Sequence, residues 1–105
     1  MNSTDLNNLV AFDDSGPAKS VFHDAGGIKA QVMCLKAGQE IPPCKMGNDV
    51  LFFVIRGEGE MVVDKDREDL KPMVSVVVPR QAESRSIHAK TDMVILAVQS
   101  LHLKV

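Results

Sequence analysis

Hydrophobic and polar side chains alternate along several short stretches of the chain. Between residues 28 and 34 every second side chain is apolar, and this period of two indicates a β-strand. The stretch 49–56 is apolar on both faces, which predicts a strand covered from two sides. Further aliphatic runs predict strands at 61–63, 73–78, 84–89 and 93–105. No segment carries a sustained helical stripe, so we predict an all-β fold, either a sandwich or a barrel.

The segment before this pattern has a different character. Residues 1–26 are mostly polar and are interrupted by Gly16 and Pro17, with one short apolar patch at 9–12 that could form a strand. We therefore expect an N-terminal arm over 1–26, partly irregular with a possible edge strand, and a barrel domain over 27–105. The charged run at 64–71 is predicted to be a solvated hairpin loop.

Composition narrows the classes of protein further. The chain has 105 residues, a formal net charge of −2 and 45% hydrophobic residues, which suits one folded domain. It has no cluster of Lys and Arg, which argues against a nucleic-acid or membrane-surface binder. No apolar run approaches the ~18 residues that a membrane helix needs. No signal peptide is evident, so we expect a cytoplasmic protein in which Cys34 and Cys44 are reduced thiols.

The spacing of glycine and proline carries a resemblance to a known family. Gly38 and Gly57 fit the first and last positions of the first cupin motif, G-x5-H-x-H-x3,4-E-x6-G. Pro79 fits the proline of the second motif, G-x5-P-x-G-x2-H-x3-N. The chain thus resembles a small single-domain cupin of the conserved-barrel, RmlC-like type. This resemblance implies a double-stranded β-helix, that is, a jelly-roll barrel of two packed antiparallel sheets.

The positions that bind the metal in cupins hold other residues here. The two histidine positions of the first motif are Cys44 and Met46, its glutamate position is Val50, and the histidine position of the second motif is Ser84. The imidazole and carboxylate ligands that suit Mn, Fe or Zn are therefore missing. We expect no metal and no other cofactor. A soft ion such as copper is the alternative, because thiolate and thioether ligands prefer Cu(I).

The strand at 84–89 has two possible registers. A strict count along the motif points Ser84 and His88 into the barrel, whereas a slip of one residue points Arg85 and Ile87 inward. Burying aliphatic side chains costs less than burying hydroxyls and an imidazole, which favours the slipped register. Arg85 then needs a partner or a wet pocket mouth, where it could hold a carboxylate.

These residues lead to three hypotheses for the function. The first is a metal-free small-molecule-binding or regulatory module with a mostly apolar pocket and no catalytic residue. The expected pocket residues are Cys34, Cys44, Met46, Val50, Phe52, Arg85 and His88. The second is a metal-dependent cupin enzyme of the dioxygenase or isomerase type with unconventional Cys, Met and His ligands. The third is a packed barrel that acts only in protein interactions. The missing ligands favour a role other than catalysis.

The strand that is apolar on both faces also predicts a partner. If Val50 and Phe52 face the barrel interior, then Leu51, Phe53 and Ile55 face outward and form an apolar patch that is unusual on a monomer. A two-fold homodimer that buries this face is the expected solution. Coverage by the N-terminal segment of the same chain is the alternative.

Overall fold

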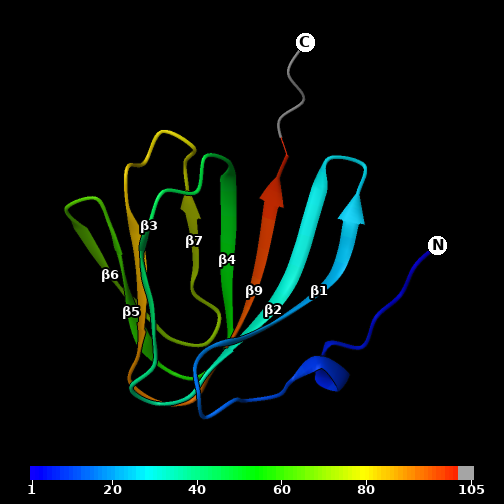
Figure 1. Ribbon diagram of the computed structural model, residues 1–105, viewed down its shortest axis with the longest axis horizontal. Coiled ribbons are helices and arrows are strands. Elements are labelled where there is room, and N and C mark those ends of the chain that lie inside the picture. Colours follow the sequence, from blue (N-terminus) through cyan, green and yellow to red (C-terminus); the bar gives the residue numbers. More distant parts are fainter. Residues whose placement is uncertain (102–105) are drawn as a thin grey trace.

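Nine β-strands form the part of the chain that the structure describes, residues 1–101 of a computed structural model (Figure 1). In chain order they are β1 (Ala18–Ala25), β2 (Ile28–Leu35), β3 (Glu40–Cys44), β4 (Asp49–Arg56), β5 (Gly59–Val63), β6 (Asp66–Leu70), β7 (Ser75–Val78), β8 (Arg85–Ala89) and β9 (Met93–Ser100). A short 3-10 helix, η1 (Leu6–Leu9), precedes them. None of the helical structure within residues 1–101 is long and apolar enough to cross a membrane. The strand predicted at 93–105 corresponds to β9, and residues 102–105 of that prediction lie outside the described range.

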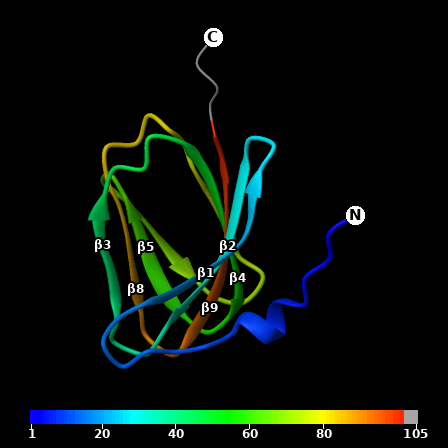
Figure 2. The ribbon, with the colours of Figure 1, turned by 45° about the vertical axis from the view of Figure 1, so that its right-hand side comes forward.

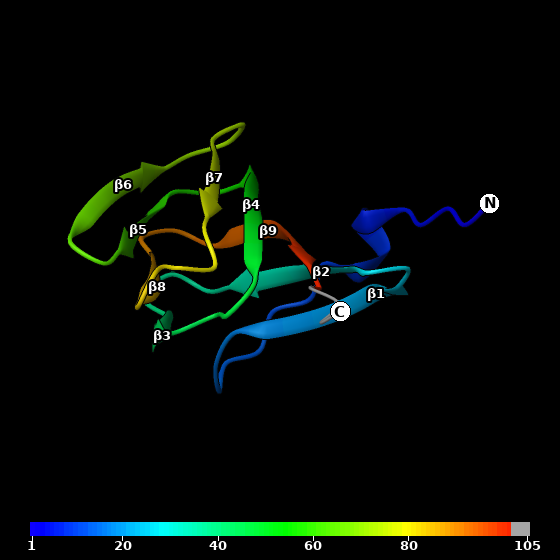
Figure 3. The same cartoon turned by 90° about the horizontal axis from the view of Figure 1, so that it is seen from above.

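The strands form two antiparallel sheets packed face to face (Figure 3). The first has five strands in the order β1-β2-β9-β4-β7, and the second has four in the order β3-β8-β5-β6. Aliphatic and methionine side chains fill the space between them, and Leu35, Met61 and Ile95 are wholly buried there. This arrangement confirms the predicted all-β jelly roll of two packed antiparallel sheets.

Strand β4 has one face inside the barrel and one outside. Val50, Phe52 and Val54 point into the core, and none is more than 2% exposed. On the opposite face, Leu51 and Ile55 each keep 38% of their surface exposed. The apolar sequence of β4 therefore reflects a buried inner face and an outer face that one chain leaves partly open.

The N-terminal arm differs from the prediction in its strand. Residues 9–12 do not form a strand; the strand contributed by the arm is β1, which forms one edge of the five-stranded sheet. Instead, Leu9 and Phe12 pack with their neighbours against the outer face of the sheet, over Val32 and Cys34 of β2 and Val94 of β9. Figure 2 shows the arm running outside β1 and β2. The apolar patch thus gains more from covering a sheet face than from extending its edge.

The charged run at 64–71 also differs from the prediction, since most of it is a strand rather than a loop. Its residues form the turn after β5 and then β6, which pairs with β5 alone. Four of the five residues of β6 are exposed. An edge strand with little burial carries no apolar alternation, which is why the sequence pattern missed it.

Two positions of the glycine skeleton show why the motif needs glycine, and where this chain departs from it. A Cβ added at Gly57 would lie 2.1 Å from the carbonyl oxygen of Asp92, and the φ of Gly57 is 91°. Met73 stands where the second motif has glycine, and its φ is 76°. The Val74 N–H donates to the Lys71 carbonyl at 3.0 Å, so Met73 occupies the third position of a turn that favours glycine there.

Candidate functional site

Arg85 is the one buried charged residue among the described residues, with 5% of its surface exposed. It begins β8, which lies between β3 and β5 in the four-stranded sheet. Along β8, Arg85, Ile87 and Ala89 are buried and His88 is exposed. The strand therefore has the slipped register, in which the aliphatic side chains and the guanidinium face the opposite sheet.

The surroundings of the Arg85 guanidinium are mostly apolar. Its Cζ atom lies 5.5 Å from the centroid of the Phe52 ring, within the range of a cation–π interaction. Its Nη2 donates to Sδ of Met46, and a thioether is a weak acceptor. Its Nε and Nη1 atoms are buried and have no hydrogen-bond partner. Burial lowers the pKa of Arg85, and nearby Cys44 partly opposes that shift.

A cavity of about 50 Å³ lies between Arg85 and the five-stranded sheet. Its apolar side is formed mainly by Met46, Val50 and Phe52. Its remaining polar residues come from β1, β2 and β9, and they are Lys19, Lys29, Gln31 and Gln99. No described residue that lines this cavity is acidic. The site is therefore a small, positively charged recess with donors on two sides.

Four of the seven predicted pocket residues come together at this cavity: Met46, Val50, Phe52 and Arg85. The cavity differs from the expected pocket in polarity. The core below it is filled by the side chains of both sheets, so the cavity near Arg85 is small. Cations and amides make up half of its lining, so it is not mostly apolar.

The other three predicted pocket residues, Cys34, Cys44 and His88, lie elsewhere. Cys34 is buried on the outer face of the five-stranded sheet, under the N-terminal arm. Cys44 is exposed at the end of β3, where its Sγ donates to the Lys45 carbonyl at 3.4 Å. His88 is exposed because the slipped register points it away from the barrel. The corrections for Cys34 and His88 have the same physical reason: the side chains of a strand alternate between faces, and the opposite face turned inward.

Sequence reasoning missed the polar residues of the recess. On β2 it took the face of Ile28 and Cys34 as the inner one, but Met33 packs in the core and Gln31 and Lys29 line the cavity. Lys29 lies opposite Gln99 in the register of β2 with β9. The alternation was visible in the sequence, but the choice of face depends on what covers each side.

The residues at the motif positions do not fit the metal that the fold family implies. Cys44 is exposed, the Met46 sulfur accepts from Arg85, and Val50 has no donor atom. In the slipped register Arg85, rather than Ser84, takes the histidine position of the second motif, and a guanidinium carries positive charge and donates hydrogen bonds but cannot ligate a cation. Nowhere in residues 1–101 do three His, Cys, Asp or Glu side chains gather as a metal site would require.

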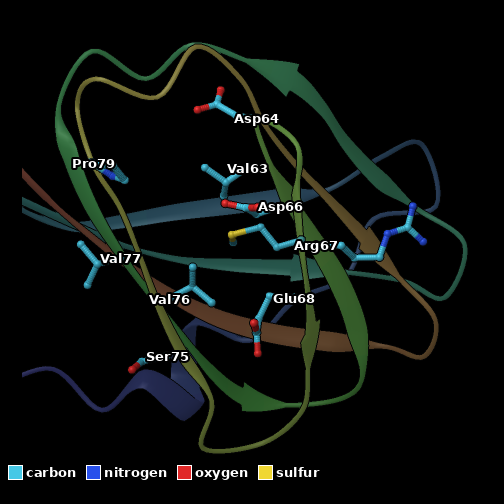
Figure 4. Close-up of a pocket in the computed structure, with 10 residues that line it drawn as sticks. Val63, Asp64, Asp66, Arg67, Glu68, Ser75, Val76, Val77 and Pro79 are labelled. Atoms are coloured by element: carbon cyan, nitrogen blue, oxygen red, sulfur yellow. The ribbon is translucent and has the colours of Figure 1, made fainter.

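A second, larger groove of about 550 Å³ opens beside the edge strands β6 and β7 (Figure 4). Asp64 accepts from two backbone amides of the loop before β8, at 2.9 and 3.0 Å. The Arg67 guanidinium points away from the other labelled side chains and pairs with Glu60 at 3.3 Å. Asp66 and Glu68 are exposed. No described side chain of this groove holds a buried polar atom that lacks a partner, which distinguishes it from the recess at Arg85.

Comparison with known proteins places the fold. No protein-family model matches the sequence, and no curated protein does either. An RmlC-like cupin from Desulfovibrio desulfuricans matches 95% of this chain and 96% of its own, with 28% identity and a TM-score of 0.84. KdgF from Halomonas sp. matches 99% and 97%, with 16% identity and a TM-score of 0.81. A salicylate 1,2-dioxygenase from Pseudoaminobacter salicylatoxidans matches 90% of this chain and 30% of its own, with 20% identity and a TM-score of 0.77.

These neighbours agree with the strand order and the packed sheets described above. They include a dioxygenase as well as a conserved Streptococcus pyogenes protein of unknown function, so the shared fold does not assign a reaction. The motif skeleton, the two-sheet topology and the structural neighbours all lead to one fold. We conclude that the chain has the jelly-roll fold of a small RmlC-like cupin domain, in which other side chains occupy the metal-binding positions of the motifs.

Proposed function

We propose that this cupin is a metal-free binding module for a small organic anion, whose carboxylate is held by Arg85. The observation that carries the proposal is the buried guanidinium, which keeps Nε and Nη1 without hydrogen-bond partners beside a cavity. An unsatisfied buried donor costs about 1–3 kcal/mol, more when it is charged. A carboxylate accepts two parallel hydrogen bonds from a guanidinium and would remove that cost.

The charge of the recess supports an anion over a neutral ligand. Arg85, Lys19 and Lys29 all line it, and no described acidic side chain does. The Phe52 ring and the Met46 thioether provide an apolar wall for the carbon skeleton of the ligand. Small apolar-walled sites with a few oriented polar groups are typical of small-molecule binding.

Calorimetric titration with propionate and with neutral propionamide tests this proposal. We expect propionate to bind with a Kd on the order of 1 mM, because so few atoms contribute. Arg85→Met should weaken it about ten- to hundredfold, the usual range for a hydrogen bond to a charged group. Arg56→Met, at an exposed arginine that ends β4, is the matched control and should leave binding unchanged.

Two outcomes would contradict the proposal. One is propionamide binding as tightly as propionate, since the site would then not recognise charge. The other is the absence of carboxylate binding to the folded wild-type protein. In that case the third hypothesis gains support, a packed barrel that acts through protein contacts, because most of the interior is already filled.

We also propose that the outer face of the five-stranded sheet packs against a second copy of the chain, in the cytoplasm, where Cys34 and Cys44 stay reduced. The N-terminal arm covers β2 and part of β9, whereas Leu51, Ile55 and their neighbour Phe53 keep partial exposure. Leu51 lies opposite Val98, and Phe53 lies opposite Leu96, so the patch continues across β9 without a charge. An uncharged apolar patch can meet itself across a two-fold axis without like-charge repulsion.

Sedimentation velocity of wild type and of Leu51→Lys tests this proposal. We expect a dimer for wild type and a monomer for Leu51→Lys, because two lysines would face each other in the contact. Val21→Lys, at a half-exposed position of the edge strand β1, is the matched control and should remain dimeric. A monomeric wild type at micromolar concentration would contradict the proposal.

A further inference from the structure

The two lysines of the recess have no described partner. Lys19 of β1 and Lys29 of β2 both line the cavity, on the sheet opposite to Arg85. Neither takes part in any of the ion pairs among residues 1–101. Asp24 lies opposite Lys29 in the register of β1 with β2, yet it forms no ion pair with it and does not line the cavity. Two cationic groups therefore remain at the β1–β2 side of the site.

The size of the recess places these groups at the second end of a bound ligand. About 50 Å³ holds a carboxylate and little more. A longer ligand would extend away from Arg85 toward the side chains of β1, β2 and β9. There it would meet Lys19, Lys29 and the amide of Gln99, whose oxygen already accepts from Asn48 at 3.2 Å and whose nitrogen can still donate.

We infer that the site selects a small dianion over a monoanion, with one carboxylate at Arg85 and a second anionic group at Lys19 and Lys29. This inference rests on the proposed function, since it assumes that Arg85 holds the first carboxylate. A monocarboxylate neutralises one of the three cations that line the recess and leaves the charges of the other two unbalanced. A short aliphatic dicarboxylate balances more of the charge, because its second carboxylate extends from the recess toward the lysines.

The contributions of the two ends should differ in their response to salt. Arg85 is buried, so its interaction with a carboxylate is screened little by ions. Lys19 is exposed and Lys29 is half-buried, so their interactions are screened as those of surface charges are. The preference for a dianion should therefore shrink as ionic strength rises, while the dependence on Arg85 should persist.

Glutarate and monomethyl glutarate form a matched pair of probes, because they have the same carbon chain and differ by one charge. At low ionic strength we expect wild type to bind glutarate about three- to tenfold more tightly, from two partly exposed ion pairs. In the double variant Lys19→Met/Lys29→Met the ratio should fall to about one, because glutarate then loses the partners of its second carboxylate. Lys65→Met, in the exposed turn between β5 and β6, is the control and should keep the wild-type ratio.

The outcomes separate this inference from the proposed function. A ratio of one in wild type, with monomethyl glutarate binding that still depends on Arg85, overturns the dianion inference alone. A ratio that the lysine variant does not change also overturns it, because the preference would then arise elsewhere. The absence of binding by both probes overturns the proposed function and the inference together. Far-UV circular dichroism of each variant establishes that it is folded.

Discussion

Replacing Arg85 by methionine should make the ligand-free protein more stable. Methionine is an unbranched side chain of similar reach, so it can occupy the same space against Phe52. It removes the buried Nε and Nη1 donors, each of which costs about 1–3 kcal/mol while it has no partner. It also removes the cation–π interaction, which offsets about 1–2 kcal/mol of that cost. The two donors together cost about 2–6 kcal/mol, so after the loss of the cation–π interaction the net expectation is a gain of between about 0 and 5 kcal/mol.

Urea unfolding followed by far-UV circular dichroism measures this change. The chain contains no Trp and no Tyr, so the backbone signal is preferable to intrinsic fluorescence. We expect the unfolding midpoint of Arg85→Met to rise with an unchanged m-value, because the surface exposed on unfolding stays the same. Arg56→Met is the control, and a surface substitution of this kind should change the free energy of unfolding by about 0.5 kcal/mol or less.

The same measurement in the presence of ligand should reverse the order. A ligand stabilises the folded state that binds it by an energy that grows with the logarithm of its concentration divided by Kd. A saturating carboxylate should therefore raise the unfolding midpoint of wild type but not that of Arg85→Met. The reasoning is refuted if Arg85→Met lowers the free energy of unfolding by 1 kcal/mol or more. Such a result would mean that the guanidinium stabilises the fold and is not held ready for a ligand.

Three further predictions concern pH and backbone conformation. Burial lowers the pKa of Arg85, so the unfolded state binds the guanidinium proton more tightly than the folded state does. The buried charge therefore destabilises the folded protein fully at neutral pH, and this destabilisation decreases as pH rises through the lowered pKa. The difference in free energy of unfolding between Arg85→Met and wild type should therefore become smaller when urea unfolding is measured at alkaline pH. A difference that becomes larger would contradict a lowered pKa for Arg85. Gly57→Ala should destabilise the fold by more than about 3 kcal/mol, because the φ of Gly57 is 91° and the new Cβ would lie 2.1 Å from a backbone oxygen. Gly16→Ala is the control: Gly16 has open space around it, so the free energy of unfolding should change little in the same assay. Met73→Gly should raise the free energy of unfolding by up to about 1 kcal/mol. A left-handed backbone costs a residue with a side chain about 1–2 kcal/mol, and glycine loses part of that gain because its unfolded state has more conformational entropy. A thermal midpoint below that of wild type would show that the exposed methionine makes contacts that outweigh the strain.

Much of the fold could be predicted from the sequence because its signals are local. A period of two identified β2, and aliphatic runs identified β4, β5, β7, β8 and β9, without any knowledge of their neighbours. The glycine and proline spacing led to the cupin barrel for a similar reason: Gly57 has a positive φ and no room for a side chain, whatever else surrounds it. The replacement of the metal ligands was also visible in the sequence, since it depends only on residue identity at counted positions.

The candidate site depended on contacts between distant segments. Both faces of β2 are apolar near Leu35, so its alternation could not say which face turns inward; the N-terminal arm decided that by covering Cys34 and leaving Lys29 to the cavity. For β8 the cost of burying hydroxyls and an imidazole favoured the register that the structure has, but it could not show what surrounds Arg85. The sequence by itself determined six of the nine strands of residues 1–101 and the replacement of the metal-ligand residues, but not β1, β3 or β6. The packing of the two sheets decided that the Arg85 guanidinium is buried with two donors that have no hydrogen-bond partner, because only tertiary structure sets which polar atoms are buried.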